Sequence, residues 1–224
     1  MNARAAGGGS TRDRLVQSAR ELFTEHGYQE ASIKEVLDRT GVSRGALYHY
    51  FASKEQLFEA VLTEIEGEIE QALLEAGSGA ASGGDALRAG CARWLDLVQD
   101  PAVRRIVLVD APAAVGWAKW RAIDARHGLG LIRLALQAEA DAGRIAHGLV
   151  EYDAHILLAA LLELGLLVAN ATDPSGARAG AQQAIESLLD RILYNAEPRD
   201  AQTLAGIEED VAEAGGLPQS RSAR

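Results

Sequence analysis

Apolar residues recur every three to four positions through most of the chain, the spacing that places them on one face of an α-helix. After the first fifty residues this pattern predicts helices at about 57–73, 87–98, 100–112, 115–141, 152–170 and 179–195. A run of Gly, Ser and Ala at 77–84 predicts a flexible loop, and Pro112 is expected to end a helix. Together with shorter helices near the N-terminus, the pattern predicts an all-α chain of about nine helices.

Two short helices separated by a glycine precede this series. Ser32 and Glu35 have the S-x-x-E spacing of a capping box, so a helix is predicted to begin at Ser32. Gly41 can adopt the left-handed conformation that ends such a helix, and Ser43 can cap the next one. In that second helix only Leu47 is a plain core residue, and the other positions are polar, aromatic, basic or small. This arrangement is typical of a helix-turn-helix that reads DNA.

The charge of the chain is unevenly distributed. The full chain has 22 Lys and Arg against 32 Asp and Glu, a net charge of −10. Residues 1–60 contain eight of each sign, so the whole excess of acid lies in residues 61–224. No acidic residue occurs between Arg39 and Lys54. The N-terminal part can therefore approach DNA, and we expect its binding to weaken as salt rises.

From Gly41 to Leu57 the chain reads GVSRGALYHYFASKEQL. This resembles the pattern G-V-S-x-G-x-L-Y-x-x-F-x-x-K-x-x-L of the tetracycline-repressor (TetR) family of bacterial transcription regulators. The similarity extends upstream through residues 14–23 and the pair at 27–28, and covers roughly the first quarter of the chain. Two places depart from the common pattern: residues 36–37 read Val-Leu where many relatives carry Ile-Ala, and Tyr50 stands where many carry His.

The resemblance implies two sets of DNA contacts. Contacts to base edges are expected from Lys34, Arg44, Gly45 and Tyr48, and contacts to the DNA backbone from Ser32, Ser43, His49, Tyr50 and Lys54. Arg44 stands near the start of the reading helix, where a bidentate contact to guanine is feasible. Lys54 lies in the first turn of the next helix, beside backbone N–H groups that suit a phosphate. Purely structural roles stay open for Ser32 and Ser43 as caps, Tyr48 as half core and Lys34 as solvated surface.

The resemblance also implies a C-terminal domain with a small-molecule pocket, whose occupation lowers affinity for the DNA operator. The candidate pocket residues are Trp94, Asp110, Trp117, Trp120, Asp124 and His127. Aromatic walls with a few carboxylates suit a planar organic effector, phenolic or cationic. The alternative is that the tryptophans belong to the core. For Trp120, packing outward beside Arg121 is also open.

The last two predicted helices carry apolar residues on more than one face. A helix that is apolar all round has to be buried all round, and a two-fold homodimer joined through a four-helix bundle would bury the extra face. The expected interface residues are Ile156, Leu161, Leu164, Ile185, Leu188, Leu189 and Ile192. Such a dimer would present two reading helices about 34–36 Å apart and select a palindromic site on double-stranded DNA.

The expected domain organisation is a flexible tail at 1–10, a DNA-binding domain at 11–57, a ligand-binding and dimerisation domain at 58–197, and a flexible tail at 198–224. Cys91 is the single cysteine, so no internal disulfide is expected. The longest apolar run, 156–169, is short for a bilayer and contains Glu163. We expect a cytoplasmic protein without a membrane partner, metal or cofactor.

Two other functions are compatible with parts of the sequence. Asp124 and His127 lie one helical turn apart, and such pairs can bind metal or shuttle protons in an enzyme. The chain lacks H-E-x-x-H, G-x-S-x-G and a phosphate-binding glycine loop, so an intrahelical pair is the simpler interpretation and no enzyme is expected. The other alternative is an architectural or coordination protein that binds many DNA sites weakly and takes no small ligand.

Overall fold

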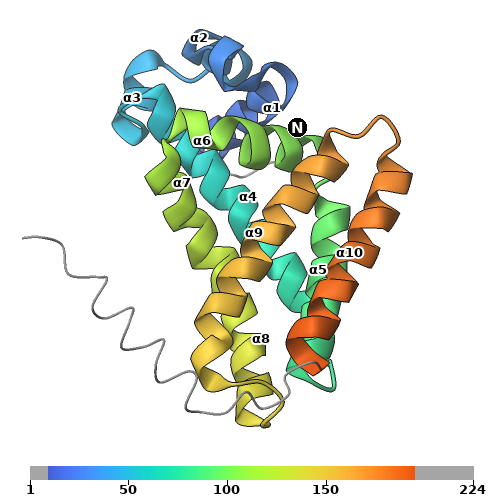
Figure 1. Ribbon diagram of the computed structural model, residues 1–224. Coiled ribbons are helices and arrows are strands. Elements are labelled where there is room, and N and C mark those ends of the chain that lie inside the picture. Colours follow the sequence, from blue (N-terminus) through green and yellow to red (C-terminus); the bar gives the residue numbers. More distant parts are fainter. Residues whose placement is uncertain (1–9, 195–224) are drawn as a thin grey trace, which may run out of the picture.

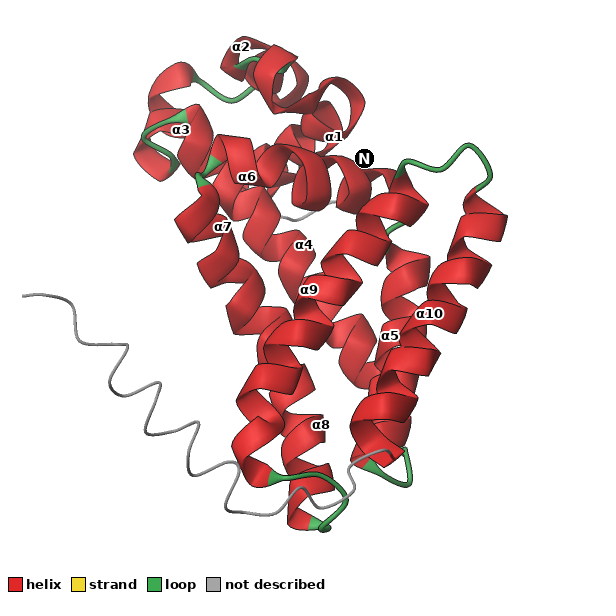
Figure 2. Ribbon diagram, viewed as in Figure 1, coloured by secondary structure: helices red, strands yellow, loops and turns green. Residues whose placement is uncertain are grey.

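The structure is a computed structural model that describes residues 10–194, without the side chains of residues 124 and 125. Within this range the regular structure is helical, which confirms the all-α prediction (Figure 1 and Figure 2). The α-helices are α1 Thr11–Glu30, α2 Ile33–Thr40, α3 Arg44–Tyr50, α4 Lys54–Gly77, α5 Gly83–Leu97, α6 Ala111–Ala114, α7 Trp117–Asp124, α8 Gly130–Asp141, α9 Val150–Ala169 and α10 Pro174–Tyr194. Two π-helical segments, η1 Val103–Asp110 and η2 Ala125–Leu129, and the short 3₁₀ turn η3 His147–Leu149 complete the described fold.

Helices α1, α2 and α3 form one end of the molecule (Figure 1). Ser10 caps α1 through a box with Asp13, so this residue of the expected tail belongs to a helix start, whereas residues 1–9 and 195–224 lie outside the described range. Gly41 has φ 66°, the left-handed conformation expected at the end of α2. Leu47 of α3 is fully buried, and together with the buried side chains of α1 and α2 it anchors these helices to the start of α4.

The remaining helices pack side by side into a bundle. Helix α4 runs from the end that carries α1–α3 into this bundle and packs along α5, while α10 packs against α5 and α9 (Figure 1). The buried apolar residues form one continuous core that extends from α1 to α10. Helix α4 packs against α1 at one end and along α5 in the bundle, so it belongs to both parts.

The segment predicted as a flexible loop is shorter than expected. Helix α4 continues to Gly77, and Ser82 caps α5, whose first residues are Gly83 and Gly84. A Cβ on Gly83 would lie 2.2 Å from the carbonyl oxygen of Ala135 on α8. These two glycines therefore permit close packing of α5 on α8, a long-range contact that a local sequence pattern does not reveal.

Pro112 does not end its helix, contrary to the prediction. The backbone N–H of Ala111 donates to the carbonyl of Ile106, five residues back, and Pro112 follows in the first turn of α6. A proline is tolerated there because the first turn of a helix needs no N–H donor. The chain turns instead at Gly116, which has φ 81°. The long segment predicted after it is divided into α7 and α8 by the π-helical segment η2.

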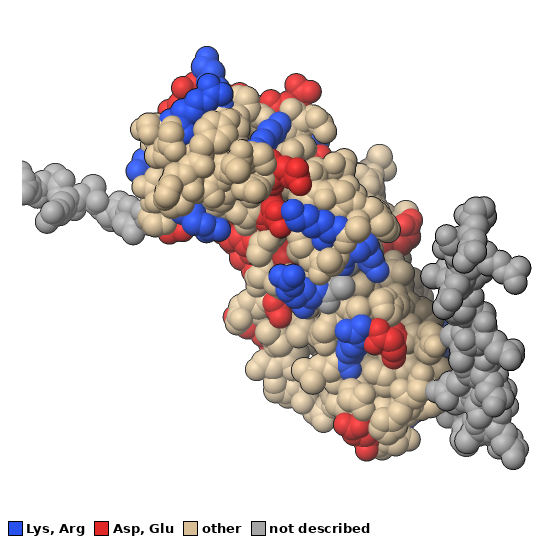
Figure 3. Space-filling model, turned by 90° about the vertical axis from the view of Figure 1, so that its left-hand side faces the viewer, with Lys and Arg blue, Asp and Glu red and all other residues tan. Residues whose placement is uncertain are grey.

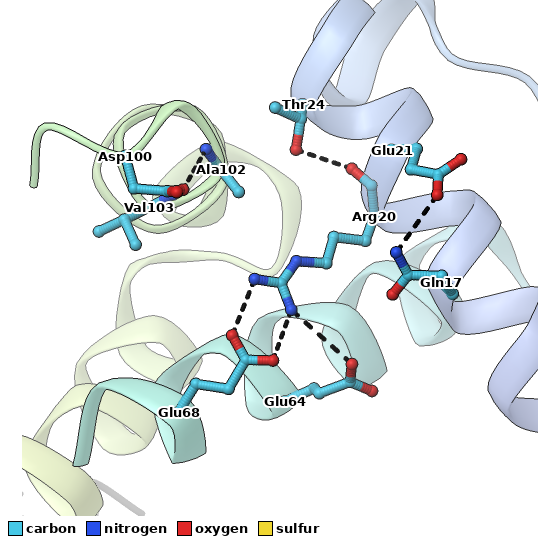
Figure 4. A network of polar contacts seen from close by, with 9 residues as sticks. All are labelled: Gln17, Arg20, Glu21, Thr24, Glu64, Glu68, Asp100, Ala102 and Val103. Atoms are coloured by element: carbon cyan, nitrogen blue, oxygen red, sulfur yellow. Dashed lines mark hydrogen bonds and ion pairs between the residues drawn. The ribbon is translucent and has the colours of Figure 1, made fainter. Parts of the chain in front are cut away.

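Two polar contacts fasten the N-terminal helices to the bundle. The guanidinium of Arg20 on α1 donates to both carboxylate oxygens of Glu68 on α4, at 2.6 and 2.8 Å, and lies 3.8 Å from Glu64 (Figure 4). At the end of η1, the carboxylate of Asp110 accepts from the backbone N–H of Tyr28 at 2.7 Å and from Nε of Arg105 at 3.1 Å. Helix α1 is thus held from both α4 and η1.

Helix α9 together with η3 is long and apolar enough, by length and composition alone, to cross a membrane. Core helices of soluble proteins meet the same criterion. In the described structure α9 packs against α5, α8 and α10, which gives it the place of a bundle helix.

Candidate nucleic-acid interface and internal cavity

Helix α3 is held so that one side of it faces solvent. Its first turn is fixed by Ser43, whose Oγ accepts from the backbone N–H of Ala46 at 3.2 Å. Leu47 is fully buried and anchors the inner side. The predicted contact residues Arg44, Gly45, Tyr48, His49 and Tyr50 are all exposed. A seven-residue helix with one buried anchor and an exposed opposite side is suited to lie in a groove.

The exposed side chains of α3 pack on one another. The guanidinium of Arg44 lies 5.8 Å from the ring centroid of Tyr48, one turn further along. His49 and Tyr50 meet edge to face at 5.3 Å. Tyr48 is 43% exposed, which places it on the surface and not half in the core. These contacts limit the rotamers of the side chains and so reduce the entropy lost on binding.

Gly45 has no structural reason within the protein to be glycine. It lies in the first turn of α3, and a Cβ added to it would meet nothing within 4 Å. Glycine in a helix costs about 0.5–1 kcal/mol relative to alanine. The position is therefore consistent with close approach of a partner to the backbone of α3.

On α2, Ser32 and Lys34 differ in their surroundings. Oγ of Ser32 accepts from the backbone N–H of Glu35 at 3.2 Å, and the Glu35 carboxylate accepts from the backbone N–H of Ser32 at 2.8 Å, which completes the predicted capping box. The hydroxyl of Ser32 also donates to this carboxylate, at 2.7 Å. The hydroxyl hydrogen of Ser32 is thus already used within α2. Lys34 is exposed in the first turn of the helix. The structure supports the capping role for Ser32 and leaves Lys34 accessible.

Lys54, at the start of α4, is engaged within the protein. Its Nζ donates to the carbonyl oxygen of Gln29 at 3.1 Å and lies 4.6 Å from the ring centroid of Tyr28. Partial burial lowers the pKa of Lys54 from its ordinary value. An ammonium group has three donors, so after the bond to Gln29 two remain for a phosphate. Lys54 therefore joins α1 to α4 at the position expected to meet the DNA backbone.

Basic side chains at this end are partly neutralised by acids of α1. Arg39 is 2.7 Å from Glu25, and Arg14 donates to the carbonyl of Thr40. Figure 3 shows Lys and Arg side chains at the end that carries α2 and α3, with uncharged surface between them. The stretch from Arg39 to Lys54 contains no acidic residue, but it lies at an end of the molecule where Asp and Glu side chains stand beside the basic ones (Figure 3).

A cavity of about 360 Å³ lies inside the bundle, between α4, α5, α8 and α9. Its wall is mainly aliphatic, with Trp94 and Cys91 from α5 and a small polar group formed by Glu66, Glu70 and His127. Nδ1 of His127 lies 2.6 Å from the carboxylate of Glu70. Burial raises the pKa of the Cys91 thiol to about 12, so it is protonated at neutral pH.

Of the predicted pocket residues, the structure places Trp94 and His127 in the cavity wall, and Asp110, Trp117 and Trp120 elsewhere. The carboxylate of Asp110 accepts from the backbone N–H of Tyr28, where η1 meets α1. Trp120 is 6% exposed and Trp117 is 66% exposed, and their rings pack on each other at 4.9 Å, outside the cavity lining. The side chain of Asp124 is outside the described part of the structure. The predicted tryptophan-rich pocket is therefore corrected to an aliphatic cavity with one tryptophan.

Glu66 and Glu70 were missed by the sequence reasoning. Glu66 falls within the apolar series Leu62, Ile65, Ile69 of α4, so a charged residue interrupts a buried face. This interruption is the feature of the sequence that could have identified Glu66 as a cavity residue. The partner on η2 was not predictable, because it depends on how the chain folds back after α7.

The predicted dimer residues divide into two groups. Ile185 and Leu189 are fully buried and Leu161 is 9% exposed and lines the cavity, so these three are covered within one protomer and are withdrawn as interface residues. Ile156 is 51% exposed, and Leu164, Leu188 and Ile192 are partly buried. Leu167, which was not predicted, is 57% exposed on α9. Leu167 lies eleven residues after Ile156, which is three helical turns and so the same face.

Comparison with known families agrees with this architecture. The family described as "Bacterial regulatory proteins, tetR family" matches residues 15–61, and "Tetracyclin repressor-like, C-terminal domain" matches residues 84–192. The chain belongs to the TetR family. The two matched regions are joined by the remainder of α4 and the turn before α5. The fold thus follows the TetR division into an N-terminal helix-turn-helix and a C-terminal helical domain.

Curated TetR-family relatives align mainly through the N-terminal part. The HTH-type transcriptional repressor AcnR of Corynebacterium efficiens is 37% identical over 68 residues, 30% of this chain and 36% of that protein. The Tn10 TetC protein of Escherichia coli is 34% identical over 108 residues, 48% of this chain and 54% of that protein. The chain thus spans about a third to a half of the length of these relatives.

The structural similarity is broader. A TetR-family transcriptional regulator from Pectobacterium atrosepticum has a TM-score of 0.71 and 28% identity, and the match covers 84% of this chain and 96% of that one. The two proteins therefore share the overall arrangement of their helices.

Proposed function

We propose that this TetR-family protein is a homodimeric, sequence-specific transcriptional repressor that leaves a palindromic operator when a small molecule occupies its cavity. The main support for the proposal is the surface of α3. The inner side of this helix is anchored in the core, and the exposed Arg44, Gly45 and Tyr48 form an outer surface suited to the major groove. Its site of action is the cytoplasm, where bacterial DNA lies.

The DNA contacts divide into reading and positioning. Arg44 is the residue best placed to read a base, since a guanidinium can donate two hydrogen bonds to guanine. Gly45 lets the backbone approach, and Tyr48 presents a ring beside Arg44. His49, Tyr50 and Lys54 position the duplex through its phosphates. Ser43 adds a hydroxyl that is able to donate while it caps α3.

The dimer is proposed to form through α9 and α10. These helices pack on each other along one side of the bundle, and exposed apolar side chains of α9, Ile156 and Leu167, lie on one face. Two copies related by a two-fold axis would bury this face in a four-helix bundle. The axis would place the two α3 helices about one turn of DNA apart.

Two connections link the cavity to the reading end. Helix α4 lines the cavity between Glu66 and Gly77 and begins at Lys54, which bonds to the end of α1. The segment η1 packs on α4 and α9 and ends at Asp110, which holds the N–H of Tyr28. An effector that binds better to one position of α4 and η1 than to another would change the distance between the two α3 helices of the dimer.

Replacing Arg44 by Ala tests the reading role. We expect Arg44→Ala to lower operator binding by about 1–3 kcal/mol and to relax base preference at one position of each half-site, while binding to unrelated DNA falls far less. Arg93→Ala is the matched control, because Arg93 is an exposed arginine on α5 that carries the same charge. Fluorescence-anisotropy titrations on both DNAs give the comparison. Equal losses on operator and unrelated DNA would remove Arg44 as a reader.

A further inference from the structure

The wall of the cavity is formed mainly by aliphatic and small residues. Leucine, isoleucine, alanine and glycine of α4, α5, α8 and α9 make up most of the described lining. Leu74 on α4 and Leu134 on α8 line the cavity and are 46% and 68% exposed, so aliphatic side chains also border its opening. A ligand gains affinity from such a wall by burying apolar surface. The cavity therefore selects its ligand mainly for apolar surface.

The polar side chains of the wall are engaged within the protein. Nδ1 of His127 lies 2.6 Å from the carboxylate of Glu70, and Nε1 of Trp94 donates to the carbonyl oxygen of Leu161 at 2.9 Å. Glu66 also interacts within the protein. A charged group that enters would lose its hydration next to ionisable side chains that already have partners, which is unfavourable. These contacts favour an uncharged ligand.

The cavity is long in relation to its volume. Helix α4 lines it from Glu66 to Gly77, and eleven residues of α-helix correspond to about 16 Å. A volume of about 360 Å³ over this length leaves room for a narrow molecule. By comparison, a cavity of about 150 Å³ holds a single benzene ring. The dimensions therefore favour a chain over a group of fused rings.

Gly90 of α5 leaves open space at this wall. It lies in the interior of α5 without a positive φ, and a Cβ added to it would meet no atom within 4 Å. Glycine in the interior of a helix is destabilising relative to alanine, so neither the backbone nor packing explains this residue. Because Gly90 lines the cavity, the space beside it is cavity space. The missing side chain thus makes room for the chain of a ligand.

We infer that the cavity binds an uncharged, elongated aliphatic molecule whose chain packs on Gly90. This inference rests on the proposed function, in which the cavity is the effector site. A cation or an anion of the same length is bound more weakly, because its charged group loses hydration on entry. A compact molecule with the same number of carbon atoms fills the narrow space less completely and makes fewer contacts with the wall.

Probes with ten carbon atoms each separate these cases: decanol, decylamine, decanoate and 1-adamantanol, which is uncharged but compact. Isothermal titration calorimetry on the full-length protein measures their affinities, with each probe below its solubility limit and its micelle-forming concentration. We expect decanol to bind about tenfold or more tightly than each of the other three.

Substitutions of Gly90 assign the binding to the cavity. Gly90→Leu is expected to weaken decanol binding at least about tenfold, because the leucine side chain occupies the space of the ligand chain. Gly67→Leu is the matched control, since Gly67 is a helical glycine on α4 with open space beside it and does not line the cavity. If Gly90→Leu fails to fold, Gly90→Ala replaces it, with an expected loss of about threefold.

The outcomes distinguish the ligand class from the proposed function. Decanol preferred, with its affinity reduced by the change at Gly90 and kept in Gly67→Leu, supports the inference. Decylamine or decanoate bound as tightly as decanol overturns the uncharged class, and 1-adamantanol bound as tightly overturns the elongated shape. Decanol affinity unchanged by a folded Gly90 variant places the binding elsewhere and also overturns the inference.

Release of labelled operator by any probe that binds would still support the effector site, whichever class that probe represents. If no probe binds, the inference is wrong, and operator binding by the same preparation shows whether the proposed DNA-binding function holds independently.

Discussion

The two glycines at positions 41 and 45 differ in what the fold requires of them. Gly45 is the clearest case, because neither backbone conformation nor packing requires a glycine there. Gly41, four residues earlier, is required by its φ of 66°. The backbone conformation thus explains the glycine at position 41, whereas for Gly45 we propose that close approach of a partner is the reason.

Replacing Gly45 by Ala separates these reasons. We expect Gly45→Ala to raise the free energy of unfolding by about 0.5–1 kcal/mol, because alanine is the better helix former, and at the same time to weaken operator binding. Gly41→Ala is the control and should lower stability because of its left-handed conformation. Urea unfolding and operator titration on the same samples measure both effects. A Gly45→Ala protein that binds operator like the parent would show that no close approach occurs at this position.

At the residue scale, the sequence predicted what is local. The caps at Ser32 and Ser43 and the left-handed Gly41 depend on residues within four positions, and the structure confirms all three. The surroundings of Asp110 depend on a residue 82 positions away, so its contact with Tyr28 was not predictable from a local pattern.

Between elements, the contact of α5 with α8 shows what local patterns miss. Glu139 on α8 is 2% exposed and accepts from the backbone N–H of Gly84 at 2.7 Å and from the guanidinium of Arg144 at 2.9 Å. The glycines that permit this contact resemble a loop in the sequence. The helices themselves were predicted, because their periodicity is local, but their packing partners were not.

The contact between Glu139 and Gly84 is expected to make the free energy of unfolding depend on pH. The hydrogen bonds from Arg144 hold the pKa of Glu139 below its ordinary 4.5. The stabilisation is therefore complete above about pH 4.5 and is lost as the pH falls through the lowered pKa of the folded state. We expect Glu139→Ala to lower the free energy of unfolding by about 1–3 kcal/mol at neutral pH, because the buried N–H of Gly84 loses its acceptor.

Urea unfolding at neutral pH and at about pH 3 measures this dependence, since the difference between parent and Glu139→Ala should narrow as the parent carboxylate is protonated. Glu75→Ala, an exposed change, should have little effect at either pH. A difference that stays constant between the two conditions would contradict the assigned role of the Glu139 carboxylate.

For the whole molecule, the surface of α9 carries the dimer proposal. From the periodicity alone, Leu189 is expected to contact the second protomer. In the structure it is buried in the core of its own protomer, so a charge at this position would test folding and not association. We expect Ile156→Glu to weaken the dimer at least about a hundredfold, because each dimer would bury two new charges. Its operator affinity should fall with it.

Sedimentation equilibrium measures the association of Ile156→Glu against Val109→Glu, a change at a similarly exposed valine on η1. Val109→Glu should remain dimeric. If Ile156→Glu associates like the parent, the dimer uses another surface and the expected spacing of the reading helices no longer follows.

The central claim is that two copies of α3 read one palindrome. Selection of bound sequences from a random DNA pool at near-physiological salt, followed by titration of full and half sites, tests it most directly. We expect one palindromic motif with half-site centres about 10 base pairs apart, which two protomers bind far more tightly than a half site. Enrichment of no motif, or of many weak unrelated sites, would contradict it and favour an architectural role.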